Sequence, residues 1–134
     1  MEPLNYSRIP NWLGKLKNLK YLDLENSYVY GLIPTSLGNL STLEYLDLSN
    51  NALTGEIPVS LGRLLSLREL DLGGNKLEEV GEECFIRLRN LEVLDISNNL
   101  LKGVLVDTHF ANLSRLNTLL IDYNEHLSFI GHEI

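Results

Sequence analysis

The sequence predicts an α/β repeat solenoid, with a concave parallel β-sheet of about five short strands and a convex side of 3₁₀ helices, short helices or irregular backbone. Three observations predict it. A leucine-rich segment recurs with a period of 24 residues, three prolines (Pro10, Pro34 and Pro58) keep the same spacing, and asparagine stands at the ninth position of four units. The units begin at Leu19, Leu43, Leu67, Leu91 and Leu116, with spacings of 24, 24, 24 and 25 residues.

We therefore expect a single repeat domain over residues 1–134. It divides into a partial unit over 1–18, four units over 19–42, 43–66, 67–90 and 91–115, and a partial unit over 116–134.

Each unit opens with a predicted strand whose first, fourth and sixth residues are apolar, as in Leu43, Leu46 and Leu48. The last two of these alternate with polar neighbours, which is the period-2 signature of a half-buried strand. Since consecutive units translate in one direction, we expect parallel pairing with the leucines inside the solenoid. Each unit then buries its apolar face only against its neighbours.

The ninth position of the unit marks a predicted inward bend after the strand. Its occupants are Ser27, Asn51, Asn75, Asn99 and Asn124. An asparagine both donates and accepts hydrogen bonds, so it can pair main-chain groups of adjacent turns that the bend leaves unpaired. We predict that this ladder is structural, and that Ser27 satisfies fewer groups.

The rest of the unit returns along the second side and closes on the convex side. Gly55 permits a tight backbone path, and Pro58 fixes an extended backbone without needing an amide hydrogen. Residues 61–64, Leu-Gly-Arg-Leu, then predict a short helical turn.

Composition and motifs argue against several classes of function. The net charge of -7 disfavours nucleic acid, whose phosphates need a basic face. A single cysteine, Cys84, excludes an internal disulfide and any cysteine-based zinc site. His109, His126 and His132 lack zinc-ligand spacing, and neither a nucleophile motif nor a phosphate-binding loop occurs. We expect no enzyme, no catalytic residue, no metal and no cofactor.

The sequence also shows no pattern typical of a targeting signal. No run approaches the ~20 apolar residues of a membrane span, and the first residues, MEPLNYSRIP, lack a basic and an apolar region. We expect neither a transmembrane segment nor a signal peptide in this chain.

The unit reads LxxLxLxxNxLxGxIPxxLGxLxx, and with it the chain resembles plant-type extracellular leucine-rich repeat proteins over roughly its whole length. The irregular third and fourth units, with the HFANLS segment at 109–114, are similar to receptor-like proteins of plant defence of the xylanase-elicitor and Cf type. This resemblance implies a horseshoe fold that recognises a protein or peptide ligand, with a co-receptor kinase as a further partner.

Members of that group carry a cysteine-bearing N-terminal cap, many more units and commonly a membrane anchor. None of these is seen here, so we interpret the chain as a fragment. The resemblance places the parent protein at the extracellular side of the plasma membrane or in the apoplast.

The concave face holds the candidate binding residues. Its 25 strand positions carry nine acidic and two basic residues, so this face alone has a formal charge of -7 and favours a basic ligand. The candidates are Tyr21, Asp23, Tyr45, Asp47, Arg68, Glu69, Asp71, Val93, Asp95 and Thr118.

Two columns of this face each admit two interpretations. The column Asp23, Asp47, Asp71 and Asp95 is either a solvated structural ladder, since the family consensus contains LDLS, or a surface that attracts a cation or basic peptide. The column Tyr21, Tyr45, Glu69, Val93 and Thr118 is either a recognition surface with tyrosine anchors or a set of residues that favour strands. Five strands offer roughly 400 Å², about half of what one partner contributes to a standard interface.

Three glycosylation sequons begin at Asn5, Asn39 and Asn112. Asn39 and Asn112 fall on the predicted convex side, where a glycan leaves the sheet free.

Two other functions remain open. The chain could belong to a secreted inhibitor of a cell-wall-degrading enzyme, resembling polygalacturonase-inhibiting proteins, and a complete C-terminal cap without an anchor would favour that. It could also be a non-functional truncated fragment, because unpaired strand edges at both ends favour self-association.

Overall fold

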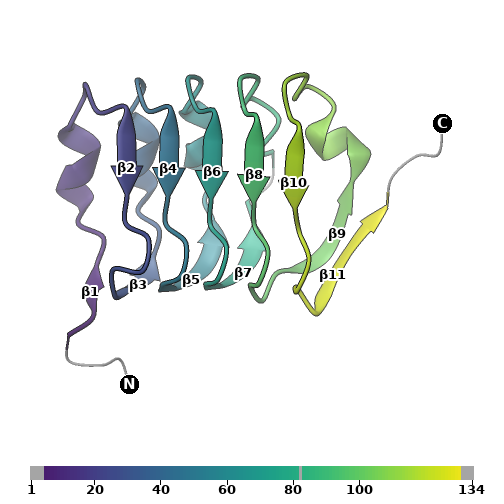
Figure 1. The fold of residues 1–134 in the computed structure, drawn as a ribbon, viewed down its shortest axis with the longest axis horizontal. Coiled ribbons are helices and arrows are strands. Elements are labelled where there is room, and N and C mark those ends of the chain that lie inside the picture. The colour runs from purple at the N-terminus through teal and green to yellow at the C-terminus, as the bar shows by residue number, and fades with distance from the viewer. Residues whose placement is uncertain (1–4, 82, 131–134) are drawn as a thin grey trace.

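The computed structural model describes residues 5–81 and 83–130. It is a solenoid of successive coils stacked along one axis, which confirms the predicted fold class (Figure 1). A five-stranded parallel sheet runs along one side in the order β10-β8-β6-β4-β2. Its strands are β2 (Tyr21–Asp23), β4 (Tyr45–Asp47), β6 (Glu69–Asp71), β8 (Val93–Asp95) and β10 (Thr118–Leu120). We call the solvent-facing side of this sheet the concave face.

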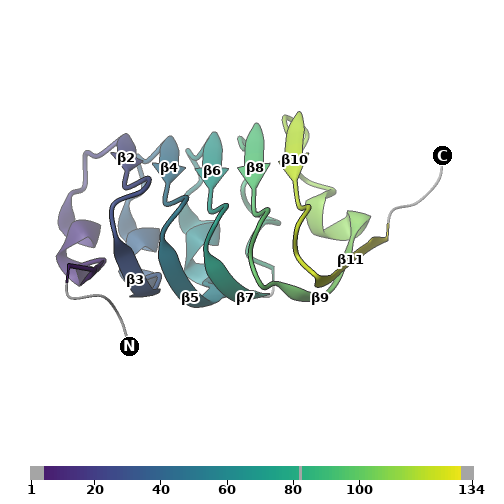
Figure 2. The same cartoon turned by 60° about the horizontal axis from the view of Figure 1, so that its bottom comes forward.

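The return segment forms strands as well, which the sequence did not predict. A parallel four-stranded sheet joins β1 (Ser7–Arg8), β3 (Val29–Leu32), β5 (Ala52–Ile57) and β7 (Lys76–Val80), and a separate pair joins β9 (Lys102–Val106) to β11 (His126–Ile130). Figure 2 shows these strands along the lower edge of the coils. Polar and apolar residues do not alternate along most of these segments, as in β5 and β9, and pairing between coils is what makes them strands.

Short 3₁₀ helices close the coils on the convex side. They are η1 (Asn11–Lys15), η2 (Thr35–Asn39), η3 (Val59–Arg63) and η4 (Asp107–Phe110). The first three follow Pro10, Pro34 and Pro58, which hold extended backbone with φ of -74°, -65° and -71°. The short helical turn predicted over residues 61–64 is confirmed, although η3 begins two residues earlier and ends one residue earlier.

Close packing between coils explains why glycine follows leucine in these turns. A Cβ on Gly38 would collide with the carbonyl oxygen of Ser60 in the next coil, and Gly14 meets Ser36 in the same way. Glycine therefore sets how closely adjacent coils approach.

Leucines of the central coils fill the interior. Leu46, Leu70 and Leu94, equivalent residues of three successive strands, are fully buried. In the first and last coils the equivalent residues, Leu22 and Leu119, are only partly buried. This follows from the architecture, because each coil is covered only by its neighbours.

The asparagines at the bends join adjacent coils. Asn75 Nδ2 donates to the carbonyl oxygens of Leu48 at 2.9 Å and Leu72 at 3.0 Å, while its Oδ1 accepts the amide hydrogen of Leu53 at 3.0 Å. Asn51, Asn99 and Asn124 repeat the pattern. The hydroxyl of Ser27, at the same position of the first unit, donates to the Glu25 carbonyl oxygen of its own coil at 3.1 Å and therefore does not join two coils.

Within the described ranges, no helix has the length and apolar character needed to cross a bilayer.

Candidate recognition face

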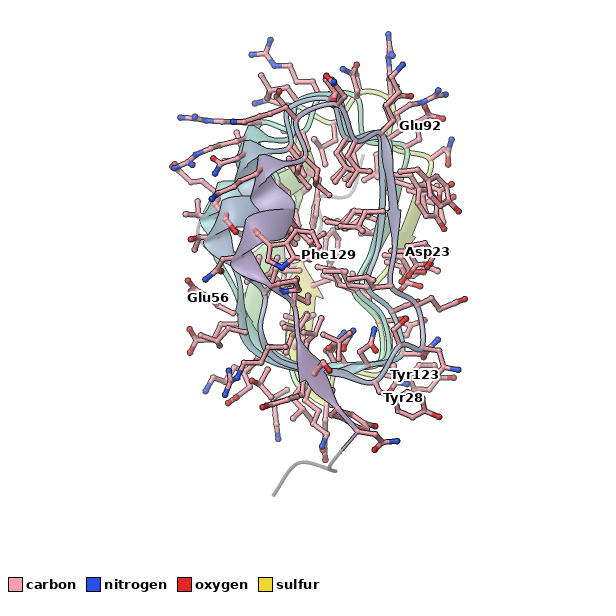
Figure 3. All side chains as sticks on the ribbon, turned by 90° about the vertical axis from the view of Figure 1, so that its left-hand side faces the viewer. Asp23, Tyr28, Glu56, Glu92, Tyr123 and Phe129 are labelled. Atoms are coloured by element: carbon pink, nitrogen blue, oxygen red, sulfur yellow. The ribbon has the colours of Figure 1, made fainter. Side chains whose placement is uncertain are left out.

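All ten candidate binding residues lie on the five-stranded sheet or directly before one of its strands. Pairing between the strands puts nine of them into two rows that cross the concave face. One row is Tyr21, Tyr45, Glu69, Val93 and Thr118, and the other is Asp23, Asp47, Asp71, Asp95 and Leu120. Arg68 belongs to a third row, directly before the strands, with Lys20, Glu44, Glu92 and Asn117. Figure 3 places Asp23 and Glu92 on this side of the coil and Glu56 on the opposite side.

Tyr21 and Tyr45 form a stacked aromatic pair at the start of the first row. Their ring centroids are 4.2 Å apart and the planes differ by 1°. Tyr21 is 58% exposed, and Tyr45 is half-buried. The Tyr45 hydroxyl donates to Asp47 Oδ2 at 3.3 Å. Burial, then the neighbouring Tyr21 hydroxyl and the Asp47 charge, raise the pKa of Tyr45, so the phenol stays protonated and keeps its role as donor.

The aspartate row caps the turns that follow the strands. Asp47 Oδ1 accepts the Ser49 amide hydrogen at 2.9 Å and the Ser49 hydroxyl at 2.6 Å, and Asp95 accepts both groups of Ser97 at the same distances. Asp23 accepts one amide hydrogen, from Glu25. The expectation of a solvated ladder is wrong for Asp47, which is only 5% exposed because Ser49 and the neighbouring strands cover it.

Asp71, like Asp23, lacks the serine hydroxyl that Asp47 and Asp95 receive, because glycine stands at position 73. Among the described residues its Oδ1 accepts the Gly73 amide hydrogen, at 3.0 Å. Burial raises the pKa of Asp71 to about 6, against the opposing effect of that hydrogen bond and with added repulsion from Asp95, Asp47 and Glu25.

Three carboxylates gather near the first coils. Oxygens of Asp23, Glu25 and Asp47 lie within 4.8 Å of one another. Oxygen ligands of this kind suit hard cations such as Ca²⁺, but exposed acidic groups often gather without one, and we assign no metal to them.

A hollow of about 300 Å³ opens beside the tyrosine pair. Its lining consists of Lys20, Tyr21, Glu44, Tyr45, Arg68, Glu69 and Glu92. Arg68 Nε lies 2.6 Å from Glu92 Oε2, and this contact raises the pKa of Arg68. Sequence reasoning placed Lys20, Glu44 and Glu92 on the face but did not select them. The repeat could have identified them, since Lys20, Glu44 and Glu92 occupy the same position of their units as Arg68.

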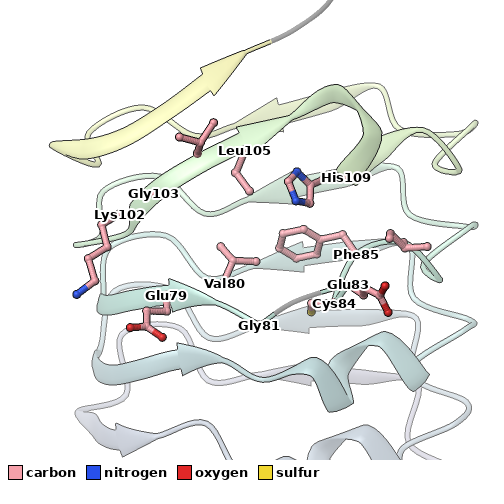
Figure 4. A pocket seen from close by; sticks show the side chains of 12 residues that line it. Glu79, Val80, Gly81, Glu83, Cys84, Phe85, Lys102, Gly103, Leu105 and His109 are labelled. Carbon is pink, nitrogen blue, oxygen red and sulfur yellow. The ribbon is translucent and has the colours of Figure 1, made fainter.

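A second hollow, of about 420 Å³, was not predicted at all. It opens where the second sheet is interrupted, between β7 and β9, and its walls include Val80, Phe85, Leu105 and His109 (Figure 4). The signal in the sequence is the third unit, which has Glu79-Val80-Gly81-Glu82 where the units over 19–42 and 43–66 have Gly-x-Ile-Pro.

Cys84 lies at this second hollow but is 1% exposed. Its Sγ donates to the Pro58 carbonyl oxygen at 3.4 Å. Burial, with a contribution from the Glu56 charge, raises the pKa of Cys84 to about 12, so the thiol is not a nucleophile at neutral pH.

The three sequon asparagines are exposed. Asn39 ends η2, and Asn112 follows η4 by two residues, so both lie on the helix side of the coil rather than on the concave face.

Comparison with known proteins agrees with this architecture. The leucine rich repeat family matches residues 17–77 and 66–127, and the chain belongs to that family. No curated protein matches the chain by sequence.

Solved structures with the same fold include plant receptor ectodomains. The ectodomain of the receptor kinase SOBIR1 from Arabidopsis thaliana is 31% identical, with a TM-score of 0.84, over 98% of this chain and 74% of its own. The Arabidopsis receptor kinase HAESA, in complex with the peptide hormone IDA and the co-receptor SERK1, is 34% identical, with a TM-score of 0.73, over 84% of this chain and 18% of its own. A plant ice-binding protein is 31% identical, with a TM-score of 0.82, over 92% of this chain and 39% of its own.

The chain thus has the fold of a plant-type extracellular leucine-rich repeat ectodomain, which is typically a non-enzymatic recognition module. The spread of functions among these similar structures means that the residues of the concave face must carry the functional argument.

Proposed function

We infer that this chain is a ligand-recognition segment of a plant cell-surface immune receptor, either a receptor-like protein or a receptor-like kinase, and that it binds a peptide or proteinaceous elicitor. The observation that carries this proposal is the concave face, where a stacked tyrosine pair and nine acidic residues lie on the five strands or within two residues of them. Large aromatic side chains with a polar tip are common anchors of protein interfaces. HAESA, a similar ectodomain, was solved with a peptide hormone.

The charge of the face favours a basic ligand. Acidic residues on one surface attract cationic partners and speed their association. A co-receptor kinase is a second partner in this proposal, since HAESA was solved with SERK1 as well as with its peptide. The immune role rests on the resemblance of the HFANLS segment at 109–114 to defence receptors.

The proposed environment is the outside of the plant cell, with glycans on Asn39 and Asn112. Both asparagines are exposed on the helix side, where a glycan leaves the concave face accessible. The face of five short strands spans roughly 400 Å², about half of the surface that one partner gives to a standard interface. Further repeats of a parent receptor would supply the remainder.

The test is capture of an elicitor on the immobilised chain. Peptide fractions from microbial culture filtrates are passed over the wild-type chain and over a variant with Tyr21→Ala and Tyr45→Ala, and retained peptides are identified by mass spectrometry. We expect peptides that the wild type retains and the variant loses, with retention falling as salt rises. A set of retained peptides that is identical for both proteins and insensitive to salt contradicts the proposal. Glu56→Gln, on the opposite side of the coil, is the matched control.

A further inference from the structure

Tyr45 has one ring face that Tyr21 does not cover. The two rings are parallel and 4.2 Å apart, so each covers one face of the other. Strand β4 pairs in register with β6, so that Tyr45 stands opposite Glu69. Because the rings stack along the row, the second face of Tyr45 looks toward Glu69, on a strand about 4.8 Å away.

The space between Tyr45 and Glu69 is electrostatically suited to a cation. The face of a tyrosine ring is the negative part of its quadrupole. Across residues 5–81 and 83–130, the salt bridge from Arg68 to Glu92 is the one ion pair, so Glu44 and Glu69 have no Lys or Arg within salt-bridge distance. Both of these glutamates line the hollow.

The hollow already shows how it accommodates a guanidinium group. Arg68 Nε lies 2.6 Å from Glu92 Oε2, a charge-assisted contact across neighbouring strands. Glu69 offers the same kind of carboxylate, and Tyr45 adds an aromatic face beside it. A volume of about 300 Å³ is at the small end for ligand sites, which suits one side chain of a larger ligand.

We propose that the space between Tyr45 and Glu69 binds an arginine side chain of a peptide ligand, with the guanidinium stacked on the Tyr45 ring and paired with the Glu69 carboxylate. This rests on the proposed recognition function and names the residue type that it recognises. Arginine fits better than lysine, because its planar guanidinium stacks on an aromatic face and donates several hydrogen bonds in one plane.

The test uses three acetylated and amidated pentapeptides that differ only in the central residue: arginine, lysine or citrulline, the neutral isostere of arginine. Each is titrated into the ¹⁵N-labelled chain and followed by NMR. We expect the arginine peptide to shift the amides of Tyr45 and Glu69 and to bind most tightly, with affinity falling as salt rises. Equal binding of the citrulline or lysine peptide overturns the assignment.

Variants then separate the two contacts. Tyr45→Leu removes the aromatic face and should weaken binding about fivefold, whereas Tyr45→Phe keeps the ring and should bind like the wild type. Glu69→Gln removes the charge without a change in size and should weaken binding by about the same factor. Arginine affinity that is unchanged in both Tyr45→Leu and Glu69→Gln overturns the proposal.

Two controls match these changes elsewhere on the surface. Tyr28→Leu alters a tyrosine that is 55% exposed and does not line the hollow. Glu56→Gln alters an exposed glutamate on the opposite side of the coil (Figure 3). Neither should change the affinity. Circular dichroism melts of all variants check that the fold is retained. If Tyr45→Leu unfolds, Glu69→Gln still tests the site, because it alters only a half-buried carboxylate.

The inference and the proposed function fail differently. If captured elicitors depend on the tyrosine pair but their arginines can be replaced by citrulline without loss, the arginine site is wrong and the recognition function stands. If the arginine peptide binds as described while capture of elicitors is identical with the face variants, the site stands and the proposed function is wrong.

Discussion

At the scale of single residues, the side-chain amide of Asn75 links the main chains of two adjacent coils. It donates to Leu48 and Leu72 and accepts from Leu53, and it is 8% exposed. A buried donor or acceptor left without a partner costs about 1–3 kcal/mol. The ladder of asparagines is therefore a stability feature rather than a binding site.

Replacing Asn75 with alanine should lower the free energy of unfolding by about 3 kcal/mol, because at least two buried main-chain groups lose their partners. Urea denaturation followed by circular dichroism measures the change. Asn39→Ala, an exposed asparagine at the end of η2, is the control and should stay within about 0.5 kcal/mol of the wild type. A loss for Asn75→Ala no larger than that of the control would contradict the structural role.

Asp71 should make stability depend on pH. Its pKa is raised to about 6 in the folded state, against about 3.9 for an ordinary aspartate, so the folded state holds the proton more tightly. The destabilising effect of its charge is absent below about pH 4, develops as the pH rises toward 6, and is complete above that. We expect the melting temperature to fall over this range, and to fall less in Asp71→Asn.

Asp122→Asn is the control for this measurement, since it removes an exposed aspartate at the end of the face. A pH profile of Asp71→Asn that overlays the wild type between pH 4 and 6 would show that Asp71 is not the group responsible. Asparagine retains an oxygen that can accept from the Gly73 amide, so the turn itself should survive.

At the scale of elements, the second sheet differs between its two parts. β5 pairs with strands on both edges, whereas β9 pairs, among the strands of the described residues, with β11 alone. The interruption coincides with the loss of the Gly-x-Ile-Pro segment in the third unit, where a turn replaces the 3₁₀ helix of other coils. One edge of β9 therefore borders the second hollow rather than another strand.

Hydrogen exchange should report this difference. Amides that point to the unpaired edge of β9 lack a ladder partner and should exchange faster than those of β5, where both edges are bonded. Exchange measured by NMR at residues 52–57 and 102–106 makes the comparison within one molecule. Equal protection of the two strands would mean that the hollow between β7 and β9 closes in solution.

At the scale of the whole molecule, the two ends differ from the middle. Leu22 in the first coil and Leu119 in the last are only partly buried. Within residues 5–81 and 83–130, the outer edges of β2 and β10 have no strand beside them. Unpaired strand edges next to apolar surface favour association with other chains.

The isolated chain should therefore associate with increasing concentration, as measured by sedimentation velocity. Leu120→Lys places a charge on the edge strand β10, where Leu120 is 45% exposed, and should reduce association. Leu65→Lys changes a leucine that is 57% exposed away from the strand edges and should not. A strictly monomeric wild type with a cooperative, reversible melt would contradict the expectation.

How much could be predicted differs from element to element. The strands of the concave face were predicted because the pattern of Leu43, Leu46 and Leu48 repeats in every unit. The helical turns were predicted from Leu-Gly-x-Leu segments such as residues 61–64. The second sheet was not, since its strands exist only through pairing between coils. Nor could the interruption after β7 be placed, although Glu79 and Gly81 show where the unit departs from its pattern.

The sequence by itself determined the solenoid, the parallel sheet, the inward leucines and the acidic character of one face. It did so because a 24-residue period assigns each residue to a defined position within its coil. Only the tertiary structure decided that Tyr21 and Tyr45 stack, that Asp47 is buried while Tyr21 is exposed, and that Arg68 pairs with Glu92. These depend on distances between side chains of different coils. A repeat fixes which residues are neighbours, but the packing of their side chains fixes what they can bind.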